Sequence, residues 1–312
     1  MRGVVTKSTG SWYTVFKEDK TKIECRLKGK FRMKGIKSTN PVSVGDYVNW
    51  EYEDAKITGV INKIFERKNY IIRKSVNLSK QTHIIASNID VAFLIVTIDN
   101  PPTFTGFIDR FLATAEAYSI PVIILFNKID TFTNETEYIK NQFSEIYTKI
   151  GYQCLDISAK TGVNIDKLKE LMKGKKSMFS GHSGVGKSTL INTIAPHLNL
   201  KTAEISKQHK QGIHTTTFAE MFELSFDGFI IDTPGIKGFG VFDFKPEEIT
   251  DYFPEFFKIK QKCKFNNCLH INEPICAIKD AMEKGEIAVS RYKSYVQMIE
   301  GDEEHYRVGQ FN

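Results

Sequence analysis

The sequence predicts an α/β P-loop core with a mostly parallel sheet, an N-terminal OB-type β-barrel and a C-terminal helical zinc-binding domain. Three observations predict this fold class. Short alternating apolar runs fill the first part, continuous apolar runs alternate with amphipathic stretches in the second, and three of the five cysteines lie close together in the third. We expect the barrel over residues 1–72, the α/β domain over residues 73–245 and the helical domain over residues 246–312.

The barrel is predicted from a period-two pattern. Ile23, Cys25, Leu27 and Phe31 stand at odd positions, whereas the even positions from 22 to 32 are charged. Such alternation indicates a strand with one buried and one solvated face. Similar short runs lie near Val4 and over residues 12–16, 47–52 and 57–64. About five short strands in about 70 residues favour a small OB-type barrel.

The central part changes character. Val91–Ile98 and Val122–Phe126 are continuous apolar runs without polar alternation, which is typical of parallel strands buried on both faces. Residues 106–118 and 135–150 have the pattern of amphipathic helices. Strands alternating with helices predict a doubly wound α/β domain.

Membrane and secretory segments are not expected. The most apolar run, Val91–Ile98, is far shorter than the roughly 20 residues of a spanning helix, and the first residues lack a signal-peptide pattern. Five cysteines, an odd number, do not resemble a disulfide framework in a chain of this length. We therefore expect a cytoplasmic protein, with Cys25 and Cys154 as small core residues.

A phosphate-binding loop is predicted at residues 181–188, which read GHSGVGKS and fit G-x-x-x-x-G-K-[ST]. The expected strand Lys176–Ser180 precedes the loop and a helix from Lys187 follows it, which is the context that separates this motif from a chance glycine-rich turn. Backbone N–H groups there would surround phosphate oxygens. Lys187 would reach the β- and γ-phosphates, as a catalytic contact, and the Ser188 hydroxyl would bind Mg²⁺. The expected nucleotide contacts are Gly181, His182, Ser183, Gly184, Val185, Gly186, Lys187, Ser188 and Thr189.

Base recognition is predicted after two neighbouring strands. Residues 127–130 read NKID directly after Val122–Phe126, at the carboxyl end where nucleotide sites form in open α/β sheets. A carboxylate at Asp130 can accept from N1–H and N2–H₂ of guanine, groups that adenine does not offer, and the Lys128 stem could cover the ring. Residues 158–162 read SAKTG, which is either a helix cap or a second base contact. The expected base contacts are Asn127, Lys128, Ile129, Asp130, Ser158, Ala159 and Lys160.

Two further segments have the composition of nucleotide switches. Residues 232–235 read DTPG, where Asp232 would hold Mg²⁺ and the Gly235 N–H would contact a γ-phosphate, although a plain Pro-Gly turn is the simpler interpretation. Residues 212–217 read GIHTTT. Thr216 is the expected magnesium and catalytic residue there, with Thr215 as the competitor, and three threonines opening a strand are the alternative. The expected magnesium ligands are Ser188, Thr216 and Asp232.

Together these motifs resemble the five guanine-nucleotide motifs of translation-factor-type GTPases, in a rotated order. NKID and SAKTG precede the phosphate loop, whereas GIHTTT and DTPG follow it. That is the order of circularly permuted GTPases. The DTPG switch then becomes the last GTPase element, so residues 236–245 would tether it to the C-terminal domain and transmit its motion.

Hydrolysis is expected to be slow without a partner. Many GTPases place a water-orienting Gln just after the DTPG region, where this chain has Ile236. His214 is the nearest candidate for orienting the water, and a solvated switch histidine is an equally good interpretation.

A metal site is predicted at the C-terminus. Cys263, Cys268, His270 and Cys276 give the spacing C-x₄-C-x-H-x₅-C. Three thiolates and one imidazole close a tetrahedral zinc shell, which favours one structural Zn²⁺ over a catalytic site. The alternative is a set of buried free cysteines beside an incidental histidine.

Barrel, rotated GTPase motifs and Cys₃His spacing together resemble the bacterial small-ribosomal-subunit biogenesis GTPases, the RsgA family. The resemblance implies binding to the 30S subunit and 16S rRNA, late small-subunit maturation and ribosome-stimulated GTP hydrolysis to GDP. Ile236 fits this family as well. The alternatives are a permuted GTPase of the large subunit and an RNA-binding adaptor that holds nucleotide with little turnover. We expect no membrane partner and a monomer when free.

The charge distribution indicates where RNA would bind. The net charge of the whole chain is only +6, but residues 1–37 alone hold 11 basic and 3 acidic residues. A cluster of this kind is typical of a phosphate-binding surface, although a solvated strand face is the simpler interpretation. The predicted RNA-binding residues are Lys22, Arg26, Lys28, Lys30, Arg32, Lys34 and Lys37.

Overall fold

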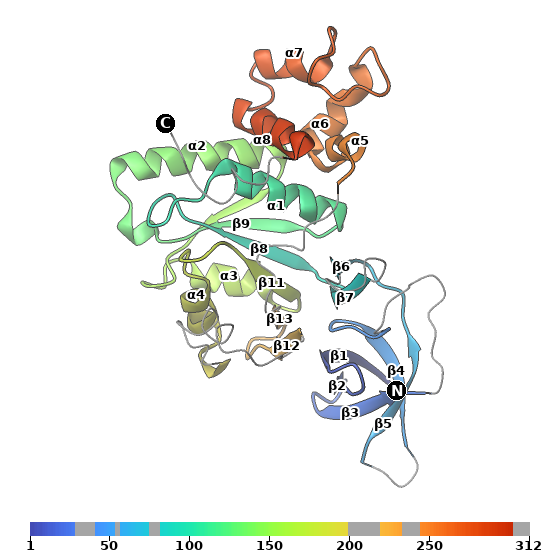
Figure 1. Ribbon diagram of the computed structural model, residues 1–312. Helices are drawn as coiled ribbons and strands as arrows, with labels where there is room; N and C mark the ends of the chain where they lie inside the picture. Colours follow the sequence, from blue (N-terminus) through green and yellow to red (C-terminus); the bar gives the residue numbers. More distant parts are fainter. Residues whose placement is uncertain (29–40, 54–56, 75–81, 199–218, 233–243, 302–312) are drawn as a thin grey trace, which may run out of the picture. The chain divides into compact units, whose positions relative to one another are not determined.

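The computed structural model describes residues 1–28, 41–53, 57–74, 82–198, 219–232 and 244–301 (Figure 1). The chain forms two compact units. The first comprises residues 1–93, 165–179 and 188–240, and the second comprises residues 94–164, 180–187 and 241–312. The domain bounds expected from the sequence, 1–72, 73–245 and 246–312, remain a prediction.

The first unit begins with a closed five-stranded barrel. Its strands are β1 (Arg2–Ser8), β2 (Tyr13–Lys17), β3 (Lys22–Leu27), β4 (Tyr47–Tyr52) and β5 (Gly59–Ile64). They are ordered β1-β2-β3-β5-β4, and β4 pairs back onto β1, which closes the barrel. This is the expected OB-type arrangement.

The alternation in β3 follows the predicted pattern. Ile23 and Cys25 are buried, whereas Lys22, Glu24 and Arg26 are exposed. The strand ends at Leu27, and the predicted continuation beyond Lys28 lies outside the described residues. Packing is tight where β5 crosses the core, since a Cβ added at Gly59 would lie 2.8 Å from the Cys25 Sγ.

The first unit also contains a hairpin and part of the α/β layer. The hairpin consists of β6 (Tyr70–Lys74) and β7 (Thr82–Ser87). Strands β11 (Lys176–Ser180) and β13 (Phe229–Asp232) are parallel, and β12 (Glu220–Glu223) runs antiparallel to β13 and beside β1. The helices here are α3 (Ile165–Met172) and α4 (Lys187–Ile194).

Strand β8 (Val91–Val96) passes from the first unit into the second, where the order is β10-β9-β8. Strand β9 (Val122–Phe126) is parallel to β10 (Gln153–Asp156). Helix α1 (Thr105–Ala117) follows β8 and α2 (Asn134–Ile150) follows β9. The predicted strands and helices of this region are therefore confirmed to within one or two residues at most ends, because continuous apolar runs and helical periodicity are local signals.

The second unit ends in short helices packed on α1. They are α5 (Pro246–Ile249), α6 (Pro254–Ile259), α7 (Ala277–Glu283) and α8 (Val289–Glu300). Their core includes Phe253, Phe256 and Tyr295, and Ala113 of α1 belongs to the same buried cluster. Within the described ranges, no helix has the length and apolar character needed to cross a membrane.

Candidate nucleotide and metal sites

Asn127 connects three of the predicted nucleotide motifs. It follows β9 directly and is buried. Its Nδ2 donates to the carbonyl of Val185 in the phosphate loop at 2.8 Å, and its Oδ1 accepts from the Ala159 N–H at 3.0 Å. A single amide therefore fixes the phosphate loop and the SAK segment relative to the NKID segment.

Asp130 and Ser158 form the second link. The Ser158 hydroxyl donates to Asp130 Oδ1 at 2.6 Å and accepts from the Thr161 N–H at 3.1 Å. The alternative of a helix cap is wrong here, because this hydroxyl closes a turn and the next helix, α3, begins further along the chain. Ala159 is buried beside it, whereas Lys160 and Asp130 are exposed.

Lys128 makes contacts that the sequence did not reveal. Its backbone is left-handed, with φ of 67°. Its Nζ donates to the carbonyls of Gly184, at 2.8 Å, and Asn100, at 2.5 Å. The side chain therefore ties the base segment to the phosphate loop and to the loop after β8.

The phosphate loop has the backbone conformation that its glycines permit. Gly184 and Gly186 have φ of 86° and 94°, where side chains are disfavoured. A Cβ at Gly186 would lie 2.5 Å from the Asn127 Nδ2, so only glycine fits against the base segment. Val185 is buried between them, and α4 begins at Lys187. The loop thus leads into a helix N-terminus, as an anion site requires.

His182 makes a contact that was not predicted from the sequence. Its Nε2 lies 2.7 Å from the Thr103 Oγ1, and its ring packs edge-on against Phe107 at 5.5 Å. Thr103 stands 79 residues earlier in the chain, just before α1. No local sequence pattern predicts such a pair, although the sequence does show a histidine at an unspecified position of G-x-x-x-x-G-K-[ST].

The candidate magnesium residues are only partly described. The register Met178↔Ile231 brings the ends of the parallel strands β11 and β13 to one sheet edge, and Asp232 ends β13 there. Ser188, in the first turn of α4, is half-buried. Thr216, Thr215, His214, Gly235, Ile236 and residues 236–243 of the tether lie outside the described residues.

The four predicted metal ligands come together. The ligand atoms of Cys263, Cys268, His270 and Cys276 all lie within 4.8 Å of one another. The His270 Nδ1 is 3.5 Å from the Cys263 Sγ and 3.4 Å from the Cys276 Sγ. A tetrahedral zinc with ordinary bond lengths separates sulfur and nitrogen ligands by about 3.5 Å, so the cluster fits this ion. Burial raises the pKa of the Cys268 thiol to about 12, and a bound metal cation would favour the thiolate there at neutral pH.

Neighbouring residues fix the ligand loop. The Glu273 carboxylate accepts from the N–H groups of Leu269, at 2.7 Å, and Ile271, at 2.9 Å. From α8, Tyr292 donates to the His270 carbonyl at 2.7 Å and Tyr295 to the Leu269 carbonyl at 3.0 Å. These contacts hold His270 in its left-handed conformation, φ 61°, and orient its ring.

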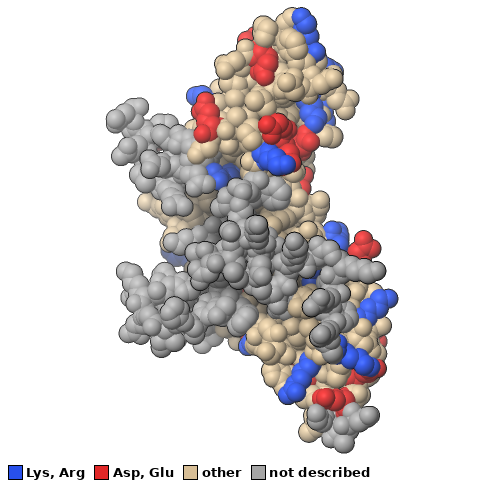
Figure 2. Space-filling model, turned by 45° about the vertical axis from the view of Figure 1, so that its right-hand side comes forward, with Lys and Arg blue, Asp and Glu red and all other residues tan. Residues whose placement is uncertain are grey.

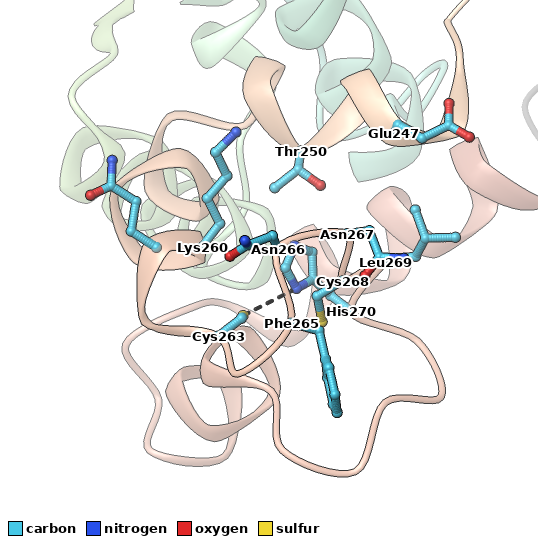
Figure 3. Close-up of a pocket in the computed structure, with 11 residues that line it drawn as sticks. Glu247, Thr250, Lys260, Cys263, Phe265, Asn266, Asn267, Cys268, Leu269 and His270 are labelled. Atoms are coloured by element: carbon cyan, nitrogen blue, oxygen red, sulfur yellow. Dashed lines mark hydrogen bonds between the residues drawn. The ribbon is translucent and has the colours of Figure 1, made fainter.

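A hollow of about 390 Å³ is lined in part by Cys263, Cys268 and His270 of the cluster (Figure 3). Thr250, Lys260 and Asn266 are among its lining residues, and the dashed line in Figure 3 joins Cys263 to His270. All four protein ligands are in place, so the donor set itself closes a tetrahedral shell and suits a structural metal.

The predicted basic face of the barrel is only partly described. Lys22 and Arg26 are exposed, and the Arg26 guanidinium stacks 4.0 Å above the Trp12 ring. Lys28 donates to Glu51 at 2.8 Å, so part of its charge is compensated. Figure 2 likewise shows basic and acidic side chains side by side on the described surface of the barrel. Lys30, Arg32, Lys34 and Lys37 lie outside the described residues.

Fold and site together define the chain as a circularly permuted GTPase. A solved structure described as YloQ, a circularly permuted GTPase, is 30% identical, with a TM-score of 0.75 over 99% of this chain and 96% of that one. YjeQ from Thermotoga maritima is 36% identical, with a TM-score of 0.79 over 96% and 97% of the two chains.

The chain belongs to the RsgA family. Residues 64–242 match the RsgA GTPase and residues 2–61 the RsgA N-terminal domain. A relative from Flavobacterium johnsoniae, named small ribosomal subunit biogenesis GTPase RsgA, is 66% identical over 98% of this chain and 95% of its own length. One of the same name from Christiangramia forsetii is 66% identical over 100% and 99%. The protein is therefore a GTPase of this family, and the expected family and fold class are confirmed.

Proposed function

We propose that this GTPase binds the 30S subunit and 16S rRNA, hydrolyses GTP to GDP and phosphate with ribosome stimulation, and assists late small-subunit maturation. The hydrogen bonds of Asn127 to Val185 and Ala159 support the nucleotide site best, because they gather residues from three separated motifs. The names of the relatives, which refer to small-subunit biogenesis, favour this proposal over action on the large subunit.

The proposed site assigns one task to each group. Asp130 reads guanine through its carboxylate, held in place by Ser158. Backbone N–H groups of residues 181–189 and the Lys187 ammonium hold the phosphates and stabilise negative charge on them. Ser188, Asp232 and Thr216 would hold Mg²⁺, which neutralises phosphate charge when bound.

Partner dependence follows from the residue after the DTPG segment. An isoleucine at position 236 cannot hydrogen-bond a water molecule, so intrinsic hydrolysis is slow. We assign orientation of the water to His214, because an imidazole can orient a water molecule and accept its proton. The variant His214→Ala then lowers the partner-stimulated kcat while leaving GTP affinity nearly unchanged.

The metal of the Cys₃His cluster is proposed to be one structural Zn²⁺, on the basis of ligand type and closed geometry. The protein is proposed to be cytoplasmic, and monomeric when free. RNA contact is assigned to the basic barrel face, where Lys22 and Arg26 are exposed and the Arg26 guanidinium lies over the Trp12 ring, a combination suited to phosphates and stacked bases.

The decisive experiment measures the GTPase rate of the full chain with purified 30S or 50S subunits. Stimulation by 30S alone supports the proposal, stimulation by 50S alone supports the large-subunit alternative, and no turnover with either supports the adaptor.

A second experiment tests the RNA-binding face of the barrel. Replacing Lys28, Lys30, Arg32 and Lys34 together should weaken 30S binding and flatten its salt dependence. Unchanged binding would place the RNA contact elsewhere.

A further inference from the structure

The second residue of the phosphate loop carries an imidazole that the motif does not require. G-x-x-x-x-G-K-[ST] leaves position 182 open. His182 nevertheless has two defined hydrogen-bond contacts, one to the Thr103 Oγ1 at 2.7 Å and one between its Nδ1 and the Ser183 carbonyl at 3.1 Å. Phe107 of α1 packs against the ring.

These contacts determine the tautomer of His182. The Ser183 carbonyl can only accept, so Nδ1 carries the proton. In the neutral ring Nε2 then accepts, and its donor is the Thr103 hydroxyl. The Thr103 Oγ1 itself accepts from the Thr97 N–H at 3.0 Å, which leaves its proton for the imidazole. Burial lowers the pKa of His182, and the Lys128 cation lowers it further, in agreement with a neutral ring.

Residues 97–103, the segment that ends with Thr103, are also close to the phosphate loop at Gly184. The Lys128 Nζ bridges the carbonyls of Asn100 and Gly184. The Pro101 ring packs so closely that a Cβ at Gly184 would lie 3.0 Å from its Cδ. Within the segment, the Thr97 hydroxyl donates to the Pro101 carbonyl at 2.6 Å. The loop is thus held at residues 182 and 184 by one hydrogen-bonded segment.

We propose that His182 is a positioning residue, which fixes the phosphate loop in its nucleotide-binding conformation through the hydrogen bond from Thr103 to Nε2. This inference rests on the nucleotide site proposed above. A loop ordered before the ligand arrives does not spend binding free energy on ordering its backbone. Loss of the bond therefore weakens GDP and GTP equally, raising KM with little change in kcat.

Two isosteric variants separate the two nitrogen atoms of the ring. In His182→Asn, the amide nitrogen replaces Nδ1 and nothing reaches Thr103. In His182→Gln, the amide oxygen replaces Nε2 and can accept from Thr103. We expect His182→Asn to weaken GDP binding roughly tenfold, the effect of one lost hydrogen bond with a stranded hydroxyl, and His182→Gln to restore most of that loss. Fluorescent GDP and the full chain are used, with the thermal midpoint of each nucleotide-free variant as a folding control.

The partner residue gives an independent check. Thr103→Val should weaken GDP binding at least as much as His182→Asn, because it also removes the acceptor of the Thr97 N–H, and Thr103→Ser should restore it. The double variant His182→Asn with Thr103→Val should be no weaker than Thr103→Val alone. Equal affinities of the Asn and Gln variants, or additive losses in the double variant, would overturn the role of His182. Lys187→Ala tests the site itself: if it binds GDP as well as the wild type does, the proposed nucleotide site fails rather than this inference.

Discussion

Two buried arginines, one in each unit, are held by carboxylates in different ways. In the first unit Arg67 meets a single carboxylate, Asp46, through Nε and Nη2 at 2.6 Å each. Asp46 also accepts from the Ser43 N–H at 2.8 Å and from the Ser87 hydroxyl at 2.6 Å. This network joins the barrel to the β6–β7 hairpin, with one cation for one anion.

In the second unit Arg291 of α8 serves two carboxylates. It donates to both oxygens of Glu255, at 2.7 and 3.1 Å, and to Asp109 of α1 at 2.9 Å. Tyr147 also donates to Asp109 at 2.9 Å, and the guanidinium lies 4.3 Å above the Phe253 ring. Burial raises the pKa of Asp109 although Arg291 acts to lower it. The C-terminal helices therefore depend on one cation shared between two anions.

The comparison teaches that the two junctions differ in what supports them. At the Arg67 junction two further donors, the Ser43 N–H and the Ser87 hydroxyl, serve a single carboxylate, whereas at the Arg291 junction the Tyr147 hydroxyl serves only one of the two carboxylates that share the cation. Tyr295 links that loop to α8, because its hydroxyl contacts the Leu269 carbonyl. Substitutions and metal removal should therefore change the stability of the two junctions to different extents.

Metal removal should have the largest effect. Chelation at neutral pH is expected to unfold residues 263–276 and loosen α7 and α8, since structural zinc contributes roughly 10 kcal/mol in zinc-finger peptides. Hydrogen exchange should then accelerate in α7 and α8 and remain unchanged in β4 and β5. Retained protection in α8 would mean that the Arg291 network alone is sufficient.

Among single substitutions at Arg291, Arg67 and Asp109, Arg291→Met should be the most destabilising. It leaves the buried Asp109 and the partly buried Glu255 without a cation, and breaking a buried pair in this way typically costs about 3–5 kcal/mol in the free energy of unfolding. Urea unfolding measures it, and the triple variant with Asp109→Asn and Glu255→Gln should recover most of the loss. A change below about 1 kcal/mol would contradict the dependence on the shared cation.

Arg67→Met should cost less, about 2–3 kcal/mol, because Asp46 retains the Ser43 N–H and the Ser87 hydroxyl as donors. Arg67→Lys serves as the matched control, since it keeps the charge and loses the bidentate geometry. If Arg67→Met were as damaging as Arg291→Met, the Ser43 and Ser87 donors would have no stabilising role.

The smallest effect is expected at Asp109. Burial raises the pKa of Asp109 in the folded state, so the protonated carboxyl stabilises the fold. This contribution is fully present at a pH below about 3.9, the pKa of the group in the unfolded chain. It is lost as the pH rises through the pKa of the folded state. Asp109→Asn keeps an acceptor for Arg291 and Tyr147. It should change stability by less than about 1 kcal/mol at neutral pH and remove this part of the pH dependence. Stability curves from pH 4 to 8 that coincide with the wild type would argue against the raised pKa.

Much of the fold was predictable because its signals are local. Val122–Phe126 is a strand with the predicted bounds, since a continuous apolar run directly before a polar loop has few other solutions. The Cys₃His cluster, which could hold a metal ion, was predictable for the same reason: its four residues lie within 14 positions of the sequence. The β6–β7 hairpin was not predicted, because each strand contains two adjacent isoleucines, which break the period-two alternation.

The sequence by itself determined the three kinds of structure, the permuted order of the nucleotide motifs and the ligands of the metal cluster, because each depends on spacing within a short stretch. Only the tertiary structure decided which residues far apart in the sequence form hydrogen bonds and ion pairs with one another. His182 and Thr103 are 79 residues apart, and Arg291 and Asp109 are 182 apart. No local sequence pattern links the members of either pair, and only packing of the folded chain brings them into contact.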